Sequence, residues 1–437
     1  MRTSRYGSVV RGPSEHQVSE IIFDVGPWFL NSIPVEINNT VLYFISRPLV
    51  PPGDPLQTAL PKLDLSSFLA AIFSTTQAET LKTTPRTSLL IPHNSAFRRL
   101  GMLVSAHLLA ASSKKDLENV LLHHALNTVE YAQSLKNGSQ HTFATLEGSD
   151  LQLDRTGNRT LFVSPSGGWA GMQAEVYTQD ILTQTGVIHE LSDVLIPRSV
   201  NLTVGKLVRA AQGSTMSSLA IKAGFDWLLD GTAPPEGSPW DDDELTGAGW
   251  TLLCPTDDAF KNLNLSQIFL DVVMLRSVVA QHVIPSPRSR DVLRMFDRDG
   301  LYNNRPLPFD DSPTYSTLHS SSSAYGDIVF RWRDDMEPNG YVVGIKDARG
   351  TDGAADWARV LSWGRSTTAG GGGVIEIDRL LTPYYPPWWI AYGAPTGVGF
   401  VGCLMICAFF YGIRVLWIRD TEATYEPVGG FGPDDES

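Results

Sequence analysis

The chain has 437 residues, enough for roughly two to four folded units at about 100 to 200 residues per domain. Its 34 Lys and Arg residues against 47 Asp and Glu residues give a net charge of −13, which argues against a surface that neutralises nucleic acid phosphates. A hydrophobic content of 42%, with 38 glycines and 28 prolines, excludes collagen and low-complexity disorder. We therefore expect a mostly folded chain with no nucleic acid partner.

The N-terminal segment contains strand-like residues but no secretory signal. MRTSRYGSVVRGPSEHQ carries basic residues without the apolar region that would follow them in a signal peptide. Residues 40–51, TVLYFISRPLVP, alternate apolar and polar residues and end at Pro, as a half-buried strand does. We expect residues 1–56 to be the end of a preceding unit whose start is missing. Alternatively, the apolar segment near the C-terminus serves as the targeting signal.

Two longer units repeat after this segment. TSLLIPHNSAFRRL (87–100) and WTLLCPTDDAFKNL (250–263) share Leu-Leu-x-Pro-x-x-x-Ala-Phe, and TGVIHELSDVLIP (185–197) resembles GGVIEIDRLLTP (372–383). Each apolar run predicts a buried strand that ends at Pro. Cys254, in the second of these strands, is interpreted as a small buried hydrophobe because no histidine pairs with it in the sequence. The predicted units are 57–198 and 199–385.

Between these anchors each unit carries a helical pattern and then strand-like runs. The helical segments are SSKKDLENVLLHHAL, with Ser113 and Asp116 as a possible N-terminal cap, and LSQIFLDVVMLRSVVAQHVI. The strand-like runs are DLQLDR, RTLFVS, GDIVFRW and GYVVGIK. Helices first and strands after predict the α+β fold class.

The sequence contains no complete motif for a metal site, a cofactor site or a catalytic site. The acidic segment 230–249 is typical of a solvated loop, and its Asp and Glu residues lack the full spacing of a calcium loop. His123 and His124 are adjacent, so on a helix they point about 100° apart, and no third metal ligand is evident. Motifs of hydrolases, metalloproteases and phosphate-binding loops are absent from the sequence. We expect no catalytic residues, no cofactor and no metal.

The C-terminal region predicts a membrane anchor at 388–413. Ala394 to Ile413 is uncharged and spans about 30 Å as a helix, which matches a bilayer core. Aromatic residues flank this stretch, and Arg414 and Arg419 follow it, as on a cytoplasmic side. A buried core helix would need a surrounding domain, yet only the short acidic tail 414–437 follows, which we expect to be disordered.

Two kinds of short motif bear on location. Asn-x-Ser/Thr triplets all precede the predicted span, which agrees with an extracellular or lumenal N-terminal side; they begin at Asn38, Asn137, Asn158, Asn201 and Asn264. In the tail, Tyr425-Glu-Pro-Val428 has the form of a tyrosine-based sorting signal, although so loose a pattern also arises by chance.

The repeated motifs resemble the signatures of fasciclin-type adhesion domains. The matching residues of the first unit are Pro92, Ala96, Phe97, His124, Gly186, Val187, Ile188, His189 and Pro197. Those of the second unit are Pro255, Asp258, Ala259, Phe260, His282, Val374, Ile377, Asp378 and Pro383. The middle tyrosine of the family is replaced by His123 and Gln281, the strand histidine of the second unit by Ile375, and the strand aspartate of the first by Ser192.

The resemblance implies tandem domains with helices packed on a β-sandwich or wedge, and a function in cell adhesion through a protein or glycan ligand on an opposing membrane or matrix. It also implies that Asp180 and Ile181 match an Asp-Ile element for receptor binding, which the second unit lacks. For fungal members of this layout it implies the alternative of a vacuolar membrane protein acting in vesicle or autophagosome fusion, so that the plasma membrane and the vacuolar membrane both remain possible locations.

The candidate partner-binding residues are Asp180, Ile181, His124 and His282, and each has a structural alternative. Asp180 next to Ile181 offers a charge and an apolar plug to a partner. Alternatively, Asp180 begins a turn and Ile181 fills the core beneath the last strand. His124 and His282 lie on apolar helices, where a core histidine bonded to backbone is the commoner role.

Overall fold

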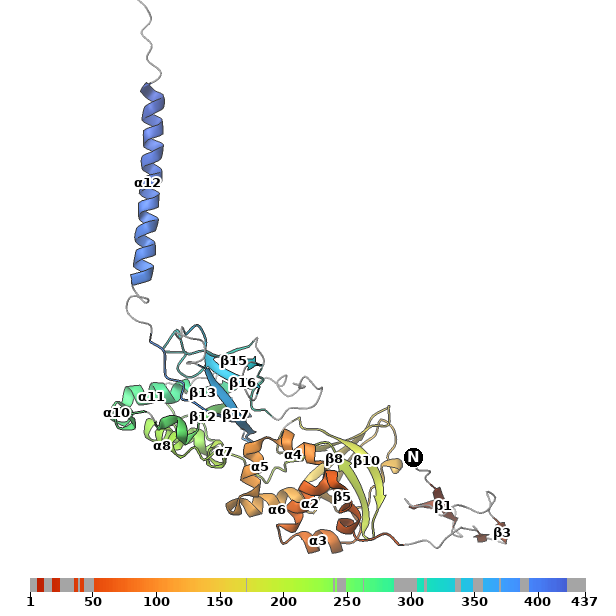
Figure 1. Cartoon of the computed structure of the whole chain (residues 1–437). Coiled ribbons are helices and arrows are strands. Elements are labelled where there is room, and N and C mark those ends of the chain that lie inside the picture. The colour runs from red at the N-terminus through yellow and green to blue at the C-terminus, as the bar shows by residue number, and fades with distance from the viewer. Residues whose placement is uncertain are drawn as a thin grey trace, which may run out of the picture. The chain divides into compact units, whose positions relative to one another are not determined.

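The structure is a computed structural model of the whole chain (Figure 1). It describes residues 51–169, 171–238, 240–241, 249–261, 263–286, 305–309, 313–334, 339–348, 357–368, 371–385 and 393–422, the last of these as backbone alone at 394–395 and 419–422. Four short strands before them are described as backbone: β1 (Tyr6–Arg11), β2 (Val18–Phe23), β3 (Val35–Ile37) and β4 (Thr40–Leu42). The chain divides into two compact units, 1–383 and 384–437.

The first lobe, residues 51–200, has helices at its start and most of its strands after them. Its helices are α1 (Pro55–Ala59), α2 (Ser66–Phe73), α3 (Ala78–Thr83), α4 (Asn94–Leu100), α5 (Met102–Leu109) and α6 (Lys114–His123). Its strands are β5 (Thr87–Pro92), β6 (Ala125–Leu126), β7 (Gln140–Ala144), β8 (Asp150–Arg155), β9 (Leu161–Pro165), β10 (Ala174–Leu182) and β11 (Gly186–Leu191). They form a seven-stranded sheet in the order β6-β5-β11-β10-β9-β8-β7, in which only β5 and β11 are parallel.

The second lobe, residues 201–383, repeats this plan. Its helices are α7 (Val204–Ala210), α8 (Ser214–Ala223), α9 (Asp226–Asp230), α10 (Leu265–Leu270) and α11 (Val272–Gln281). Its strands are β12 (Gly249–Pro255), β13 (Val283–Ser286), β14 (Thr314–Tyr315), β15 (Ile328–Arg333), β16 (Gly340–Ile345), β17 (Trp357–Arg365) and β18 (Gly372–Ile377). The sheet order is β13-β12-β18-β17-β16-β15-β14, so each strand has its counterpart seven strands earlier.

The two faces of each sheet bury different apolar residues. Alternate residues of β5 show this division: Leu89 and Ile91 pack with the helices, whereas Leu90 packs with residues of β8, β9 and β10 on the other face. In the second lobe Leu252 and Leu253 divide in the same way. The period of two in a strand therefore serves two cores at once, and the predicted α+β fold class is confirmed.

One predicted helix is interrupted. The sequence pattern predicts continuous helix over residues 265–284, but the structure has α10, a break at Asp271, α11 and then strand β13. The Asp271 carboxylate accepts hydrogen bonds of 3.0 Å from the amides of Val273 and Met274, so it caps a new helix. Similarly, the segment predicted as helix over 112–126 ends at His123 and continues as β6.

The two lobes contact each other through α5 of the first and α7 and β17 of the second. A Cβ atom placed on Gly364 in β17 would lie 2.9 Å from Cβ of Leu103 and 3.1 Å from Cδ2 of Leu207. At the edge of this contact the Lys206 ammonium lies 2.9 Å from the Asp116 carboxylate. Only a residue without a side chain allows α5 and β17 to approach so closely.

The second compact unit contains helix α12 (Ala394–Glu422). Within it Thr396–Ile418, 23 residues, is long and apolar enough to cross a bilayer, and none of this stretch is buried. A helix that is apolar on all sides needs an apolar environment around it.

Candidate recognition site

His124 and His282 occupy equivalent positions at the C-terminal ends of α6 and α11. In His124, Nδ1 lies 2.7 Å from the carbonyl of Val120, and Nε2 accepts a 3.1 Å hydrogen bond from the amide of Leu195. In His282 the corresponding distances are 2.7 Å to Val278 and 3.0 Å from the amide of Leu381. Both side chains are fully buried.

These contacts define the charge of both imidazoles. A backbone amide can only donate, so Nε2 must accept and Nδ1 must carry the proton, which makes the ring neutral. Burial lowers the pKa of His124 to about 3 and that of His282 to about 4. Each histidine therefore joins the end of a helix to the segment that follows the last strand. This is the role of a core histidine bonded to backbone, the structural alternative given for these two residues.

Asp180 is buried, whereas a charge offered to a partner would be exposed. It lies in an irregularity of β10 between Thr178 and Ile181, in a left-handed conformation with φ of 59°. Only 7% of its surface is exposed, and Oδ1 accepts a 2.7 Å hydrogen bond from the amide of Ala132. Ile181 is likewise 7% exposed and packs in the helix-side core, so neither side chain is presented to a partner in this conformation.

A buried histidine faces this aspartate. The backbone amide of Asp180 lies 3.4 Å from Nδ1 of His189, and Nε2 of His189 lies 2.9 Å from the carbonyl of Glu130. Burial lowers the pKa of His189, and the Asp180 charge opposes that shift only in part. In the second lobe, Trp363 pairs with Ile375 at this place without the extra residue.

The exposed group next to this region is Tyr177, one residue before Thr178 in β10. Its side chain is 45% exposed, and its ring meets the His93 ring edge-on with centroids 5.2 Å apart. Nε2 of His93 lies 3.0 Å from Glu190, which also accepts hydrogen bonds from Lys62 and, at 2.7 Å, from Thr178. Sequence reasoning missed this cluster because strands and helices distant in the chain build it.

Charge-assisted contacts hold this cluster in place. Burial alone would raise the pKa of Glu190, but hydrogen bonds from Lys62, Thr178 and His93 lower it. Nearby, Nε of Arg99 lies 2.9 Å from Asp193, and its other end donates to the carbonyl of Ser192. We call the surface formed by Tyr177, His93, Lys62 and Arg99 the Tyr177 face.

The second lobe carries the same framework with a different exposed residue. Thr178 opposes Glu190 across β10 and β11, and Ser362 opposes Glu376 across β17 and β18 with a hydroxyl–carboxylate hydrogen bond. By this register Leu361, which is 42% exposed, occupies the position of Tyr177. Of the two lobes, the first therefore combines an aromatic ring with fixed charges.

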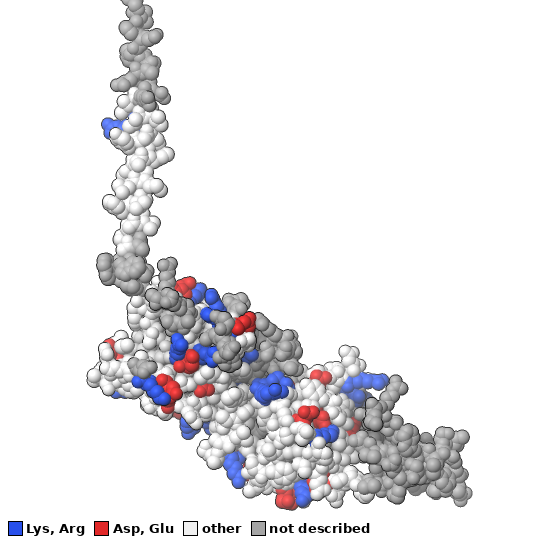
Figure 2. All heavy atoms as spheres, viewed as in Figure 1, with Lys and Arg blue, Asp and Glu red and all other residues white. Residues whose placement is uncertain are grey.

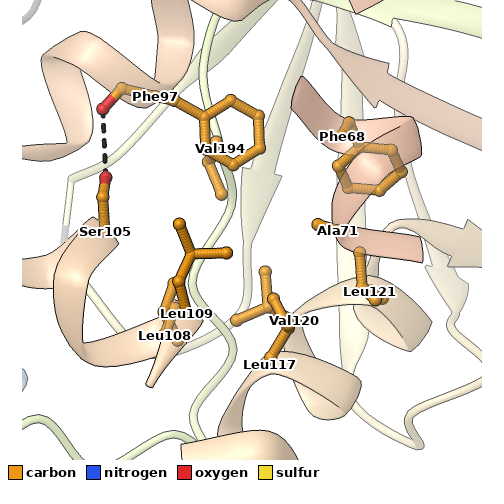
Figure 3. Close-up of a pocket in the computed structure, with 10 residues that line it drawn as sticks. All are labelled: Phe68, Ala71, Phe97, Ser105, Leu108, Leu109, Leu117, Val120, Leu121 and Val194. Atoms are coloured by element: carbon orange, nitrogen blue, oxygen red, sulfur yellow. Dashed lines mark hydrogen bonds between the residues drawn. The ribbon is translucent and has the colours of Figure 1, made fainter. Parts of the chain in front are cut away.

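An apolar hollow lies among α2, α4, α5 and α6 of the first lobe (Figure 3). Phe68, Phe97, Leu109 and Val194 are among its lining residues, and the hydroxyl of Ser105, its one polar side chain, donates to the carbonyl of Phe97. Its volume of about 20 Å³ is close to the space that one water molecule needs. It is a packing gap between helices, too small for a ligand.

One arrangement has the residue types of a hydrolase triad. Ser113 lies 3.2 Å from Nδ1 of His107, whose Nε2 lies 2.9 Å from Asp116. Ser113 and His107 are buried, and Lys206 also binds Asp116, so the hydroxyl is not presented at the surface. Burial would raise the pKa of Asp116, but the bonds from Lys206 and His107 lower it.

Other reactive groups lie equally deep. Cys254 is fully buried in β12, and burial raises the pKa of its thiol to about 12, so its interpretation as a buried hydrophobe is confirmed. Within the described ranges, three or more His, Cys, Asp or Glu residues do not gather anywhere as metal ligands would.

The glycosylation triplets that the structure describes lie at the surface. Asn137, Asn158, Asn201 and Asn264 are exposed. Asn38, Tyr425 and Val428 lie outside the described residues.

Fasciclin-domain proteins are among the known proteins to which this chain is similar. A fasciclin domain model matches residues 63–197. Human periostin is 28% identical over 247 residues, which cover 56% of this chain and 26% of periostin. A fasciclin-like arabinogalactan protein of Arthroderma benhamiae is 27% identical over 202 residues, 46% of this chain and 43% of that protein. The chain thus spans less than half the length of these relatives.

Among solved structures, a FAS1 domain pair from the insect cell adhesion molecule Fasciclin I aligns with 73% of this chain and 96% of its own, with 15% sequence identity and a TM-score of 0.27.

Proposed function

Because this chain belongs to the fasciclin-like family, we propose that it is a non-enzymatic adhesion protein that displays two lobes of this fold from a membrane. Its task is recognition of a protein or glycan on an opposing membrane or matrix. The observation that carries the proposal is the Tyr177 face, where an exposed aromatic ring sits on a rigid set of charged groups. Aromatic and Arg side chains of this kind dominate the binding energy of protein interfaces.

The Tyr177 face takes the place of Asp180 and Ile181 as the proposed contact site. Tyr177 and Asp180 lie on the same strand three residues apart. The Tyr177 face is therefore next to the segment that the family resemblance implies for receptor binding. Recognition through Asp180 itself would require β10 to open and to break the bond to Ala132. In this proposal His124 and His282 stabilise the fold and do not contact a partner.

Membrane anchorage completes the proposal. The apolar stretch Thr396–Ile418 serves as the span, and the exposed triplets at Asn137, Asn158, Asn201 and Asn264 receive glycans on the extracytoplasmic side. Anchoring many copies in one membrane raises their local concentration, so weak contacts act together when two surfaces approach.

The proposal is tested by binding of proteoliposomes that carry the full chain to arrays of matrix proteins and glycans. Tyr177→Ala should lower retention on the bound partner by about tenfold, the effect of removing an aromatic interface residue. Leu361→Ala is the matched control, since it removes a similarly exposed residue at the equivalent position of the second lobe. Equal retention of Tyr177→Ala and the unmodified chain would remove the Tyr177 face from the proposal.

The sorting motif in the tail favours a second location. If Tyr425 and Val428 direct the chain to a vacuolar or lysosomal membrane, its recognition role becomes one in fusion of vesicles or autophagosomes with that compartment. A fluorescently tagged chain should then lie on the internal membrane, and Tyr425→Ala should move it to the cell surface. Surface residence of the unmodified chain would contradict this alternative.

A further inference from the structure

The corner between α10 and α11 exposes a continuous group of apolar side chains. Leu270 is 86% exposed and Val273 76%, while Val272 and Met274 are 50% and 42% exposed. These four residues are almost consecutive, and Asp271 between them uses its carboxylate to cap α11. An exposed apolar group of this kind marks a contact surface, since isolated exposed residues are common but clusters are not.

The chain leaves the second lobe close to this helix. The amide of Leu381 donates to His282, which lies at the C-terminal end of α11, whereas the apolar corner lies at its N-terminal end. The ten residues of α11 make a helix about 15 Å long. The exit of the chain and the apolar corner are therefore separated by little more than the length of one helix.

The connection to the apolar helix is short. Ten residues, 384–393, separate the end of the lobe at Pro383 from α12, and they reach at most about 35 Å when extended. A tether of this length exceeds the separation between the exit and the corner, so the corner can reach any bilayer in which α12 is inserted. The same tether holds the corner at a high effective concentration next to that bilayer.

The charges around the corner suit a lipid surface of low net charge. Among residues 265–281, Asp271 is balanced by Arg276, and Lys222 of α8 lies 4.5 Å above the Phe269 ring. Figure 2 shows Lys, Arg, Asp and Glu side chains of both signs scattered among uncharged surface at this end of the lobe. Lys and Arg next to apolar side chains can keep their charged ends at the headgroups while their stems lie on the apolar surface.

We propose that Leu270, Val272, Val273 and Met274 insert into the interfacial region of the bilayer that anchors the chain. The contact orients the second lobe on the membrane and leaves the first lobe to meet partners. This inference rests on the membrane anchorage that is part of the proposed function. It does not depend on which ligand the Tyr177 face binds.

The test uses the full chain in phosphatidylcholine vesicles that contain doxyl-labelled phosphatidylcholine. A fluorescent NBD group is attached to Val273→Cys in a chain with Cys403→Ser and Cys407→Ser; Cys254 is buried and does not compete. Gln140→Cys in the same background carries the label on an exposed residue of β7 in the first lobe. A chain that retains Cys403, with Cys407→Ser, reports on α12 itself.

Quenching is expected at Cys403 and at Val273→Cys, with emission from Gln140→Cys unchanged. Quenching at Cys403 without quenching at Val273→Cys would overturn the inference and leave anchorage intact. Absence of quenching at Cys403 would overturn the anchorage and the inference together. A blue shift at Val273→Cys that grows with protein density but is insensitive to doxyl lipid would assign the corner to a second copy, and would also overturn it.

Discussion

His124 and His282 make the same three hydrogen bonds in the two lobes. Besides the two ring contacts, the carbonyl of His124 accepts from the amide of Leu90 at 2.7 Å, and that of His282 accepts from Leu253 at 2.8 Å. Each histidine thus joins its helix to the first strand of the sheet and to the segment after the last strand. Two copies of one buried polar junction in a single chain indicate that the junction is part of the fold.

Acid should destabilise both lobes through these histidines. Their folded-state pKa values of about 3 and about 4 lie below the ordinary 6.5, so between these limits the unfolded chain binds more protons. The free energy of unfolding is therefore highest above pH 6.5. It falls as the pH drops toward 4, by about 1.4 kcal/mol per histidine for each pH unit. Urea unfolding of the full chain in detergent at pH 7.5 and pH 5.5 measures this loss. Equal stability at both values would contradict neutral, buried histidines.

Replacing His124 with Ala should destabilise the first lobe by about 2 to 4 kcal/mol. The change leaves the amide of Leu195 and the carbonyl of Val120 buried without partners and opens a cavity. His141→Ala is the control, because His141 is exposed on β7. The comparison is made by chemical unfolding, and similar midpoints for the two variants would count against a bridging role.

Asp180→Ala should lower stability by about 1 to 3 kcal/mol, because it removes the acceptor for the buried amide of Ala132. Asp180→Asn keeps an acceptor oxygen and a residue type that tolerates positive φ, so it should cost less. Thermal unfolding of the two variants separates these effects. If Asp180→Ala instead reduced partner binding with an unchanged midpoint, Asp180 would be a contact residue.

Gly364→Ala should weaken the contact between the lobes by about 1 to 3 kcal/mol, since the added Cβ would lie 2.9 Å from Leu103. Gly157→Ala is the control, because space around Gly157 is open. Differential scanning calorimetry should show separation of one transition into two for Gly364→Ala alone. Identical traces for both variants would contradict a tight contact between α5 and β17.

Much of the fold follows from local sequence pattern. The apolar runs around Leu90 and Leu253 predict buried strands because two faces are covered, and repeated motifs predict that the second lobe copies the first. The break at Asp271 could also have been found, since Asp before a helical apolar run is a typical N-cap.

The site was less predictable because it depends on long-range register. Asp180 resembles an exposed acid in sequence, but an irregularity in β10 turns it inward, and no local pattern reveals that extra residue. The Tyr177 face joins α4, β10 and β11 through His93 and Glu190, which are 97 residues apart. Contacts across that separation come from the fold and not from motif spacing.

Display of the lobes from a membrane is tested most directly by protease protection in sealed microsomes that contain the full chain. If the lobes are displayed in this way, they resist added protease until detergent opens the vesicles, glycosidase lowers the apparent mass of the protected fragment, and alkaline carbonate does not extract it. Lobes that are digested in sealed microsomes, with unmodified Asn137, Asn158 and Asn201, would contradict it.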